Sequence, residues 1–516
     1  MTERQAPDMD RIVSDNSRRI AKNTLLLYFR MLLLLFIGLF TSRVILRSLG
    51  QSDFGLYNTV ASFVTIFTVL TNAVSSSISR YLTFELGKGD SGRLGRVFST
   101  AMVIQILFCL ILLLFTETAG MWYLHHVMNI PPGREEAALW VLQCSMGVLM
   151  LNLLSVPFNA TIIAHEKMSA FAYISILEAV LKLGVALLIF ISPADKLKDY
   201  AVLMLLVALT VRVTYAVYSK RRFEETRTRL VMDRQMLGEM FSFAGWNLFG
   251  SGAYIVNTHC VNQLVNVFFG VVVNAARGVA LQIETIVRQF VSNFLTALNP
   301  QITKSYASGD RDYCFNLVNK GAKYAFLIMW LIALPICFEA DILLDIWLVD
   351  VPEYSSIFVK LSVFFAMVDL MCGTVVTLEL ATGDIKRFYI WVGCLALSVL
   401  PVSWILFALG CPPSVSYIVF LAVYVLVDIA KLLVVGRQVG FSVSGYVREV
   451  LIPAAKVALP SLLVTWIVWR MIPEGGWRLI AVLLVSTAAT VAATWLFALT
   501  DGERAVVSSK LKRLPK

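Results

Sequence analysis

The sequence predicts an all-α protein that crosses a membrane about 14 times, and three observations predict it. Apolar residues make up 58% of the 516 residues and charged residues only 15%, whereas a soluble domain carries about 25% charged residues. The apolar residues gather in runs of about 20 or more, the length at which a helix spans the hydrocarbon core. Lys and Arg collect in alternate loops between these runs. No length remains for a large soluble domain, so a water-soluble enzyme is excluded.

Fourteen apolar segments bounded by Gly, Pro or charged turns are each predicted to be one membrane-spanning helix. In chain order they cover residues 24–49, 54–83, 95–116, 137–164, 170–192, 199–218, 240–268, 272–299, 320–346, 354–380, 387–409, 413–435, 452–472 and 477–499. The first follows a polar, basic tail without a small-residue cleavage site, so no removable signal peptide is expected. The turn after the second segment reads Gly-x-Gly-x-x-Gly over residues 87–92, but no strand precedes it and a nucleotide site is not expected.

The basic residues orient these segments, because Lys and Arg collect in short cytoplasmic loops. An even number of spans places both termini on one side, and 27 Lys and Arg fall on that side. The opposite loops hold only Arg134, Lys196 and Lys198. Both termini are therefore expected in the cytoplasm. The net charge of +10 reflects this topology and does not indicate a nucleic-acid partner.

An internal repeat relates the first six spans to the next six. Gly50 and Gly270 close the first and seventh spans, and Gly89-Asp90 and Gly309-Asp310 follow the second and eighth, at offsets of about 220 residues. Six is even, so the two halves run in the same direction, an arrangement typical of transporters. The predicted divisions are a tail at 1–23, six-helix bundles at 24–235 and 236–436, and two additional helices with a basic tail at 437–516.

Two helix-end motifs give the chain a family resemblance. Residues 49–58 read Leu-Gly-Gln-Ser-Asp-Phe-Gly-Leu-Tyr-Asn, and Arg80-Tyr81 leads to Glu-Leu-Gly-Lys-Gly at 85–89. With the layout of fourteen spans, these resemble the Wzx-type oligosaccharide flippases (O-antigen and lipopolysaccharide exporters) of the multidrug/oligosaccharidyl-lipid/polysaccharide (MOP) superfamily, over about residues 20–435. The resemblance implies two bundles whose first, second, seventh and eighth helices line a cavity. It also implies alternating access that carries an undecaprenyl-diphosphate-linked glycan to the periplasmic leaflet.

Polar residues mark the same four helices as candidates for lining a cavity. They recur at three- or four-residue steps and so share helix faces, although such residues also join helices by hydrogen bonds. Arg30 and Arg288 lie deep in apolar runs, Arg277 lies nearer an end, and an ion pair with Glu284 would neutralise Arg288. The predicted substrate-binding residues are Arg30, Asn58, Asn72, His259, Asn262, Asn266, Arg277, Glu284 and Arg288.

These residue types suit an anionic glycan lipid. Arginine stays charged and donates two parallel hydrogen bonds to phosphate, while Asn, Ser and Thr exchange hydrogen bonds with sugar hydroxyls. No Walker A sequence occurs, so direct ATP hydrolysis is not expected, and a gradient is expected to drive transport. Asp369 and Glu379 are the candidates for ion coupling, and the remaining intramembrane charges, including Glu178 with Lys182, are interpreted as structural. The scattered cysteines form no disulfide framework or metal site, and no cofactor is expected.

Two other functions remain open. A multidrug or cation antiporter of the same superfamily would need acidic residues in the N-terminal half, but the first four spans have none in their central portions. A membrane glycan polymerase or transferase is disfavoured because the largest outer loop, residues 117–136, is short. The expectation is therefore a transporter and not an enzyme. Its partners would be a lipid-linked oligosaccharide and membrane lipids, with a glycan polymerase and glycosyltransferases as further candidates.

Overall fold

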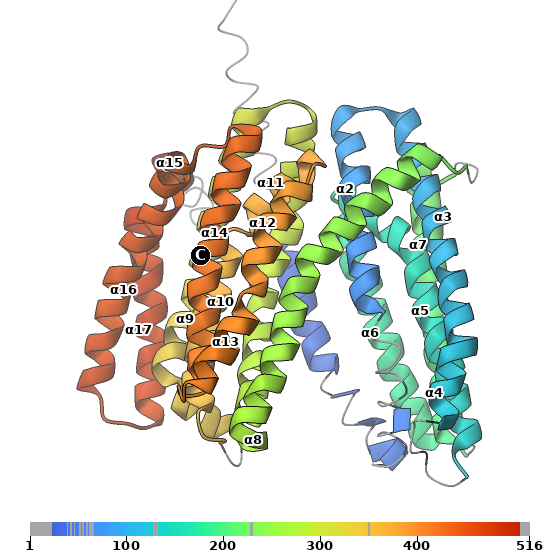
Figure 1. Ribbon diagram of the computed structural model, residues 1–516, viewed down its shortest axis with the longest axis horizontal. Coiled ribbons are helices and arrows are strands. Elements are labelled where there is room, and N and C mark those ends of the chain that lie inside the picture. Colours follow the sequence, from blue (N-terminus) through green and yellow to red (C-terminus); the bar gives the residue numbers. More distant parts are fainter. Residues whose placement is uncertain are drawn as a thin grey trace, which may run out of the picture. The chain divides into compact units, whose positions relative to one another are not determined.

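The computed structural model describes residues 23–38, 40–41, 44–45, 47–50, 53, 56–57, 60, 67–126, 130, 133–193, 195–227, 231–348 and 351–505. Within these ranges every regular element is a helix (Figure 1). The chain forms two compact units: residues up to Leu248 with Thr303–Gly309, and Phe249–Ile302 with Asp310–Lys516. We call them unit 1 and unit 2.

Unit 1 is a bundle of helices. A helix over Asn23–Gly38 comes first. The others are α2 (Thr68–Lys88), α3 (Ser91–Phe115), α4 (Met121–His126), α5 (Glu135–Ala164), α6 (Met168–Ile191), α7 (Lys196–Arg222) and the start of α8 (Arg234–Ala307), with short turns η1 (Thr116–Gly120) and η2 (Glu224–Arg227). The long helix α5 packs against α7, α2 and α3 and so holds the bundle together. Leu112, Val141, Leu142 and Leu153 belong to the core around it.

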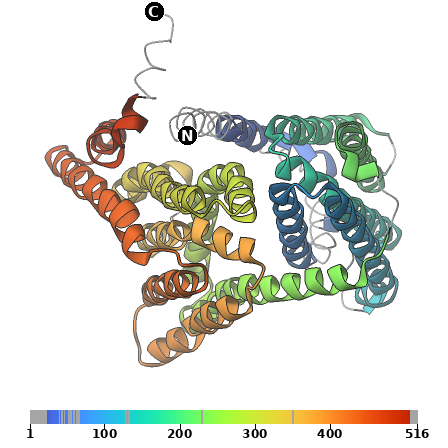
Figure 2. The same cartoon turned by 90° about the horizontal axis from the view of Figure 1, so that it is seen from above.

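Unit 2 contains most of α8 and the helices that follow it (Figures 1 and 2). These are α9 (Arg311–Trp347), α10 (Ser355–Met371), α11 (Gly373–Thr382), α12 (Lys386–Leu397), α13 (Val399–Ala408), α14 (Val415–Val439), α15 (Val443–Tyr446), η3 (Val447–Leu451), α16 (Ile452–Met471), α17 (Gly476–Ala493) and η4 (Thr494–Ala498). The α10 helix packs between α9 and α14. Met329, Ala333, Val363 and Ala366 form part of the core there.

The helices match the fourteen predicted spans. Ten helices in the described ranges are long and apolar enough to cross a membrane. The first two spans correspond to the segment from Asn23 and to α2, and the seventh and eighth lie within α8. The α8 helix breaks at Gly270, which has φ 83° and ψ −176°, a conformation that favours glycine. This break lies where the sequence predicts the turn between the two spans.

The last two spans pack on α9 within unit 2. Trp330 Nε1 of α9 donates a hydrogen bond of 2.9 Å to Ser461 Oγ of α16. Arg478 of α17 pairs with the fully buried Glu339 of α9, with N–O distances of 3.0 and 3.2 Å. A buried carboxylate without such a partner would be costly, so this pair fixes the position of α17 against α9.

Candidate functional site

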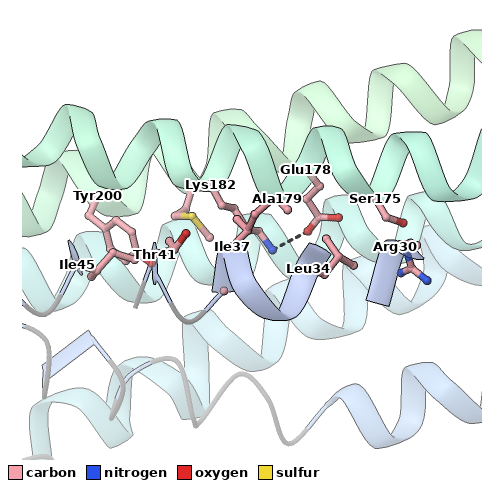
Figure 3. A pocket seen from close by; sticks show the side chains of 12 residues that line it. Arg30, Leu34, Ile37, Thr41, Ile45, Ser175, Glu178, Ala179, Lys182 and Tyr200 are labelled. Carbon is pink, nitrogen blue, oxygen red and sulfur yellow. Dashed lines mark ion pairs between the residues drawn. The ribbon is translucent and has the colours of Figure 1, made fainter. Parts of the chain in front are cut away.

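A pocket of about 470 Å³ lies inside unit 1, between the first segment, α6 and α7 (Figure 3). Its wall combines apolar side chains with groups that carry charge or hydroxyls. The lining residues are Arg30, Leu34, Ile37, Gly38, Thr41, Ile45, Ser175, Glu178, Ala179, Lys182, Tyr200 and Met204. Two cations and one carboxylate give the wall a formal charge of +1, in a region of the chain that is otherwise strongly apolar.

The charged residues of the pocket differ in their partners. Lys182 Nζ is 2.6 Å from Glu178 Oε1, one helical turn away (Figure 3), as the spacing of four residues predicts. Arg30 forms no ion pair with a described residue and instead places its guanidinium 4.3 Å from the centre of the Phe171 ring. Its buried Nε has no hydrogen-bond acceptor among the described residues, and neither does the Thr41 hydroxyl have a partner there. The pocket therefore contains unused hydrogen-bond donors.

A chain of five ion-paired residues lies inside unit 2. Arg288 of α8 pairs with Glu284 at 2.7 Å and with Asp369 of α10 at 2.8 Å. Lys431 of α14 pairs with Asp369 at 3.4 Å and with Asp428 at 2.8 Å. Three carboxylates and two cations give this group a formal charge of −1. We refer to it as the unit 2 ion network.

Arg277 lies elsewhere in unit 2 and is almost fully buried. It donates a long hydrogen bond of 3.4 Å to Ser416 Oγ, and its guanidinium lies 4.8 Å from the Tyr417 ring centre. It has no ion pair with a described residue, and its Nε lacks an acceptor there. Arg212 of α7 is similar, because it lies 4.4 Å from the Phe158 ring centre and its Nη1 has no acceptor among the described residues.

The predicted polar substrate-binding residues of the second and seventh spans are at least partly exposed where the structure describes them. Asn72 and His259 are exposed, and Asn262 and Asn266 are half-buried. The Asn262 side-chain oxygen is buried and has no described donor. Asn58 lies outside the described residues.

The structure brings some of the candidates together and separates others. Glu284, Arg288 and Asp369 meet in the unit 2 ion network, whereas Glu379 of α11 is fully buried and neither of its carboxylate oxygens has a described partner. Sequence reasoning missed that Asp428 and Lys431 join the network, and that Glu178 and Lys182 share a pocket with Arg30. The available signal was an acid and a base three or four residues apart in an apolar helix.

Comparison with solved structures identifies the fold. The chain is similar to a MATE protein in a straight conformation (TM-score 0.71), to an outward-facing multidrug-resistance MATE family transporter of the MOP superfamily (0.68) and to a MOP superfamily transporter from Pyrococcus furiosus (0.66). Each is 11% identical, and each alignment covers 82% of this chain and 96% of the other. The chain therefore has the MATE fold, and with its apolar helices it is a multi-pass membrane protein.

Sequence comparison adds less. No model of a known protein family matches the chain. An uncharacterized membrane protein of Bacillus subtilis (strain 168), EpsK, is 21% identical over 328 residues, which are 63% of this chain. The match covers 64% of EpsK, slightly less than two thirds of its length.

Proposed function

We propose that this protein is an alternating-access transporter of the MOP type that flips an undecaprenyl-diphosphate-linked oligosaccharide from the cytoplasmic to the periplasmic leaflet of a bacterial inner membrane. The fold supports membrane transport, because the similar solved structures include proteins described as transporters. The lipid-linked glycan is the finer part of the proposal. It agrees with the helix-end motifs and would place the protein in the synthesis of a cell-surface polysaccharide such as O-antigen.

The observation that carries the proposal is a set of three membrane arginines that have no carboxylate partner among the described residues. Arg30, Arg212 and Arg277 each lie over an aromatic ring, and each has a buried N–H without an acceptor among the described residues. A charged arginine in a membrane-spanning helix is costly, by about 2.5–3.5 kcal/mol on insertion scales where it lies at the centre. Such a cost favours residues that receive a ligand, and the ligand that suits an unpaired guanidinium is an anion such as phosphate.

The carboxylates of the unit 2 ion network favour an anionic over a cationic cargo. In the unit 2 ion network each of the three carboxylates is already engaged by Arg288 or Lys431, and the unit 1 pocket has an excess of positive charge. The similar transporter from Pyrococcus furiosus is described as having a binding pocket of reverse polarity and a different function. A multidrug transporter remains the second candidate, because another similar structure is of a multidrug-resistance protein.

The energy source follows from the charge of the cargo. A membrane potential that is negative inside favours outward movement of an anion by about 2.3 kcal/mol per charge per 100 mV. Asp369 in the ion network and Glu379, whose carboxylate has no partner among the described residues, remain the candidates for an additional coupled ion.

Reconstitution tests the proposal. The full chain would be placed in proteoliposomes with a fluorescent undecaprenyl-diphosphate-linked disaccharide. Flipping would be measured as the fraction of this lipid that is protected from a membrane-impermeant quencher. We expect flipping to accelerate when the membrane potential is negative on the side that the lipid leaves. The rate should fall at least tenfold in Arg277→Ala and recover in part in Arg277→Lys. Arg470→Ala, which changes an exposed arginine at the end of α16, should be unaffected. Uptake of the cationic dye ethidium without lipid flipping would refute the proposal and favour the multidrug alternative.

A further inference from the structure

The pocket in unit 1 has the features of a built anion subsite. Arg30 enters it from the first segment and Lys182 from α6 (Figure 3). Thr41 lines it with a hydroxyl that has no described partner, on a side chain that is more than nine-tenths buried. Ser175 and Tyr200 also line the wall, but their hydroxyls already form hydrogen bonds with the Phe171 carbonyl oxygen and with Tyr57. The pocket thus offers two cations and the Thr41 hydroxyl to one ligand.

We propose that this pocket binds the diphosphate group of a prenyl diphosphate, and that Glu178 is the counter-ion which the ligand displaces from Lys182. The proposal rests on the proposed function, because it assigns a subsite for the head group of the same lipid. In the structure Glu178 lies 2.6 Å from Lys182, and Arg30 lies against the Phe171 ring. When a diphosphate enters, Lys182 and Arg30 each bind a phosphate oxygen and Glu178 loses its partner.

The exposure of the pair makes this exchange feasible. The Lys182 and Glu178 side chains are 41% and 37% exposed and both line the pocket, so a ligand in the pocket can reach the pair. A ligand with two or more negative charges offers Lys182 more charge than the single carboxylate of Glu178. The arginine adds donors fixed in one plane that match phosphate geometry. Glu178 then sets specificity, since it repels anions that cannot engage both cations.

The volume and the apolar wall define the class of ligand. About 470 Å³ accommodates a diphosphate and its first attached groups. Leu34, Ile37, Ile45 and Met204 provide an apolar surface beside the charged groups, as a phosphate attached to a hydrocarbon chain requires. The same chemistry is available from free pyrophosphate and from phospholipid head groups, so the experiment separates these sources.

The test measures binding of farnesyl diphosphate to the purified full chain in nanodiscs by microscale thermophoresis. Farnesol, inorganic pyrophosphate and phosphatidylglycerol are the comparison ligands. We expect farnesyl diphosphate to bind the native protein and to bind at least tenfold more weakly to Arg30→Ala and Lys182→Gln. Glu178→Gln is expected to bind it about threefold to tenfold more tightly, because the competing counter-ion is gone. Glu117→Gln removes an exposed carboxylate elsewhere in unit 1 and should leave the affinity unchanged.

Each outcome decides the proposal. Tighter binding by Glu178→Gln supports it and cannot arise from misfolding, whereas equal or weaker binding overturns the exchange. Farnesol that binds as well as farnesyl diphosphate shows an apolar pocket and also overturns it. If phosphatidylglycerol competes as well as farnesyl diphosphate, the pocket binds bulk phospholipid. If pyrophosphate competes equally well, the pocket binds a soluble anion. Either result removes the link with a transported lipid. If the binding pattern is as expected but reconstituted flipping is absent, the proposed function fails and the subsite stands.

Discussion

Replacing Arg288 by Met should destabilise unit 2 more than any single change at an exposed charge. Arg288 is the described ion-pair partner of Glu284, at 2.7 Å, and a partner of Asp369, at 2.8 Å. Its loss changes the formal charge of the unit 2 ion network from −1 to −2 and leaves the buried Glu284 unpaired. Removing one partner of a buried ion pair costs about 3–5 kcal/mol. We expect about 3 kcal/mol here, because Asp369 keeps Lys431 at 3.4 Å.

A loss of about 3 kcal/mol lowers the folding equilibrium constant about 150-fold. The assay is unfolding of the purified chain in mixed micelles of increasing dodecyl sulfate content, followed by tryptophan fluorescence. The control Arg387→Met removes an exposed arginine at the start of α12 and should change stability by less than about 0.5 kcal/mol. The double variant Glu284→Gln/Arg288→Met returns the network to a charge of −1 and should regain part of the loss. A loss below about 1 kcal/mol in Arg288→Met, or a double variant less stable than the single one, would refute the reasoning.

Four other changes give specific expectations. Arg478→Leu leaves Glu339 buried without its partner, so the midpoint of thermal unfolding should fall, and Glu339→Gln/Arg478→Leu should recover part of it. Ser461→Ala removes the acceptor of Trp330 Nε1 and should cost about 1 kcal/mol in the same micelle titration. Gly87→Val places a Cβ about 2.7 Å from the Lys304 carbonyl oxygen, whereas Gly184→Ala meets nothing within 4 Å; only the first should lower the yield of folded protein in size-exclusion chromatography. Burial opposes charge on Glu503, but the Thr500 N–H and Lys323 outweigh it and lower the pKa of Glu503. Its contribution to stability should therefore be present at neutral pH and be lost as the pH falls through its lowered pKa, and Glu503→Gln should flatten that part of the pH–stability profile.

The sequence predicts the helices well because the membrane imposes their length. A spanning helix needs about 20 apolar residues, and the turns contain residues with clear local effects. Gly270 interrupts α8 where the prediction separates two spans, and Gly89 ends α2 with φ 76° before Asp90 caps α3. The spans remain visible in the sequence even in α8, where two of them follow each other with only a break at Gly270 between them.

The candidate site was only partly predictable, because its members come from distant parts of the chain. The pairing of Glu284 with Arg288 follows from helical spacing. The contact of Arg288 with Asp369 joins residues 81 positions apart, and only the packing of α10 on α8 brings them together. Similarly, the pairing of Glu178 with Lys182 is local, but their place beside Arg30 depends on how the first segment packs on α6. The aromatic partners Phe171, Phe158 and Tyr417 have no spacing that relates them to the arginines they contact.

The path of α8 has a mechanical consequence. The chain passes from one unit to the other between Leu248 and Phe249, between Ile302 and Thr303, and between Gly309 and Asp310. The first two crossings lie within α8 rather than in a loop. A rotation of one unit against the other would therefore require this helix to bend. Pro300 precedes the second crossing and lacks the N–H that would close a helical hydrogen bond. We expect such a rotation to be centred at this proline, where the helix lacks one backbone hydrogen bond.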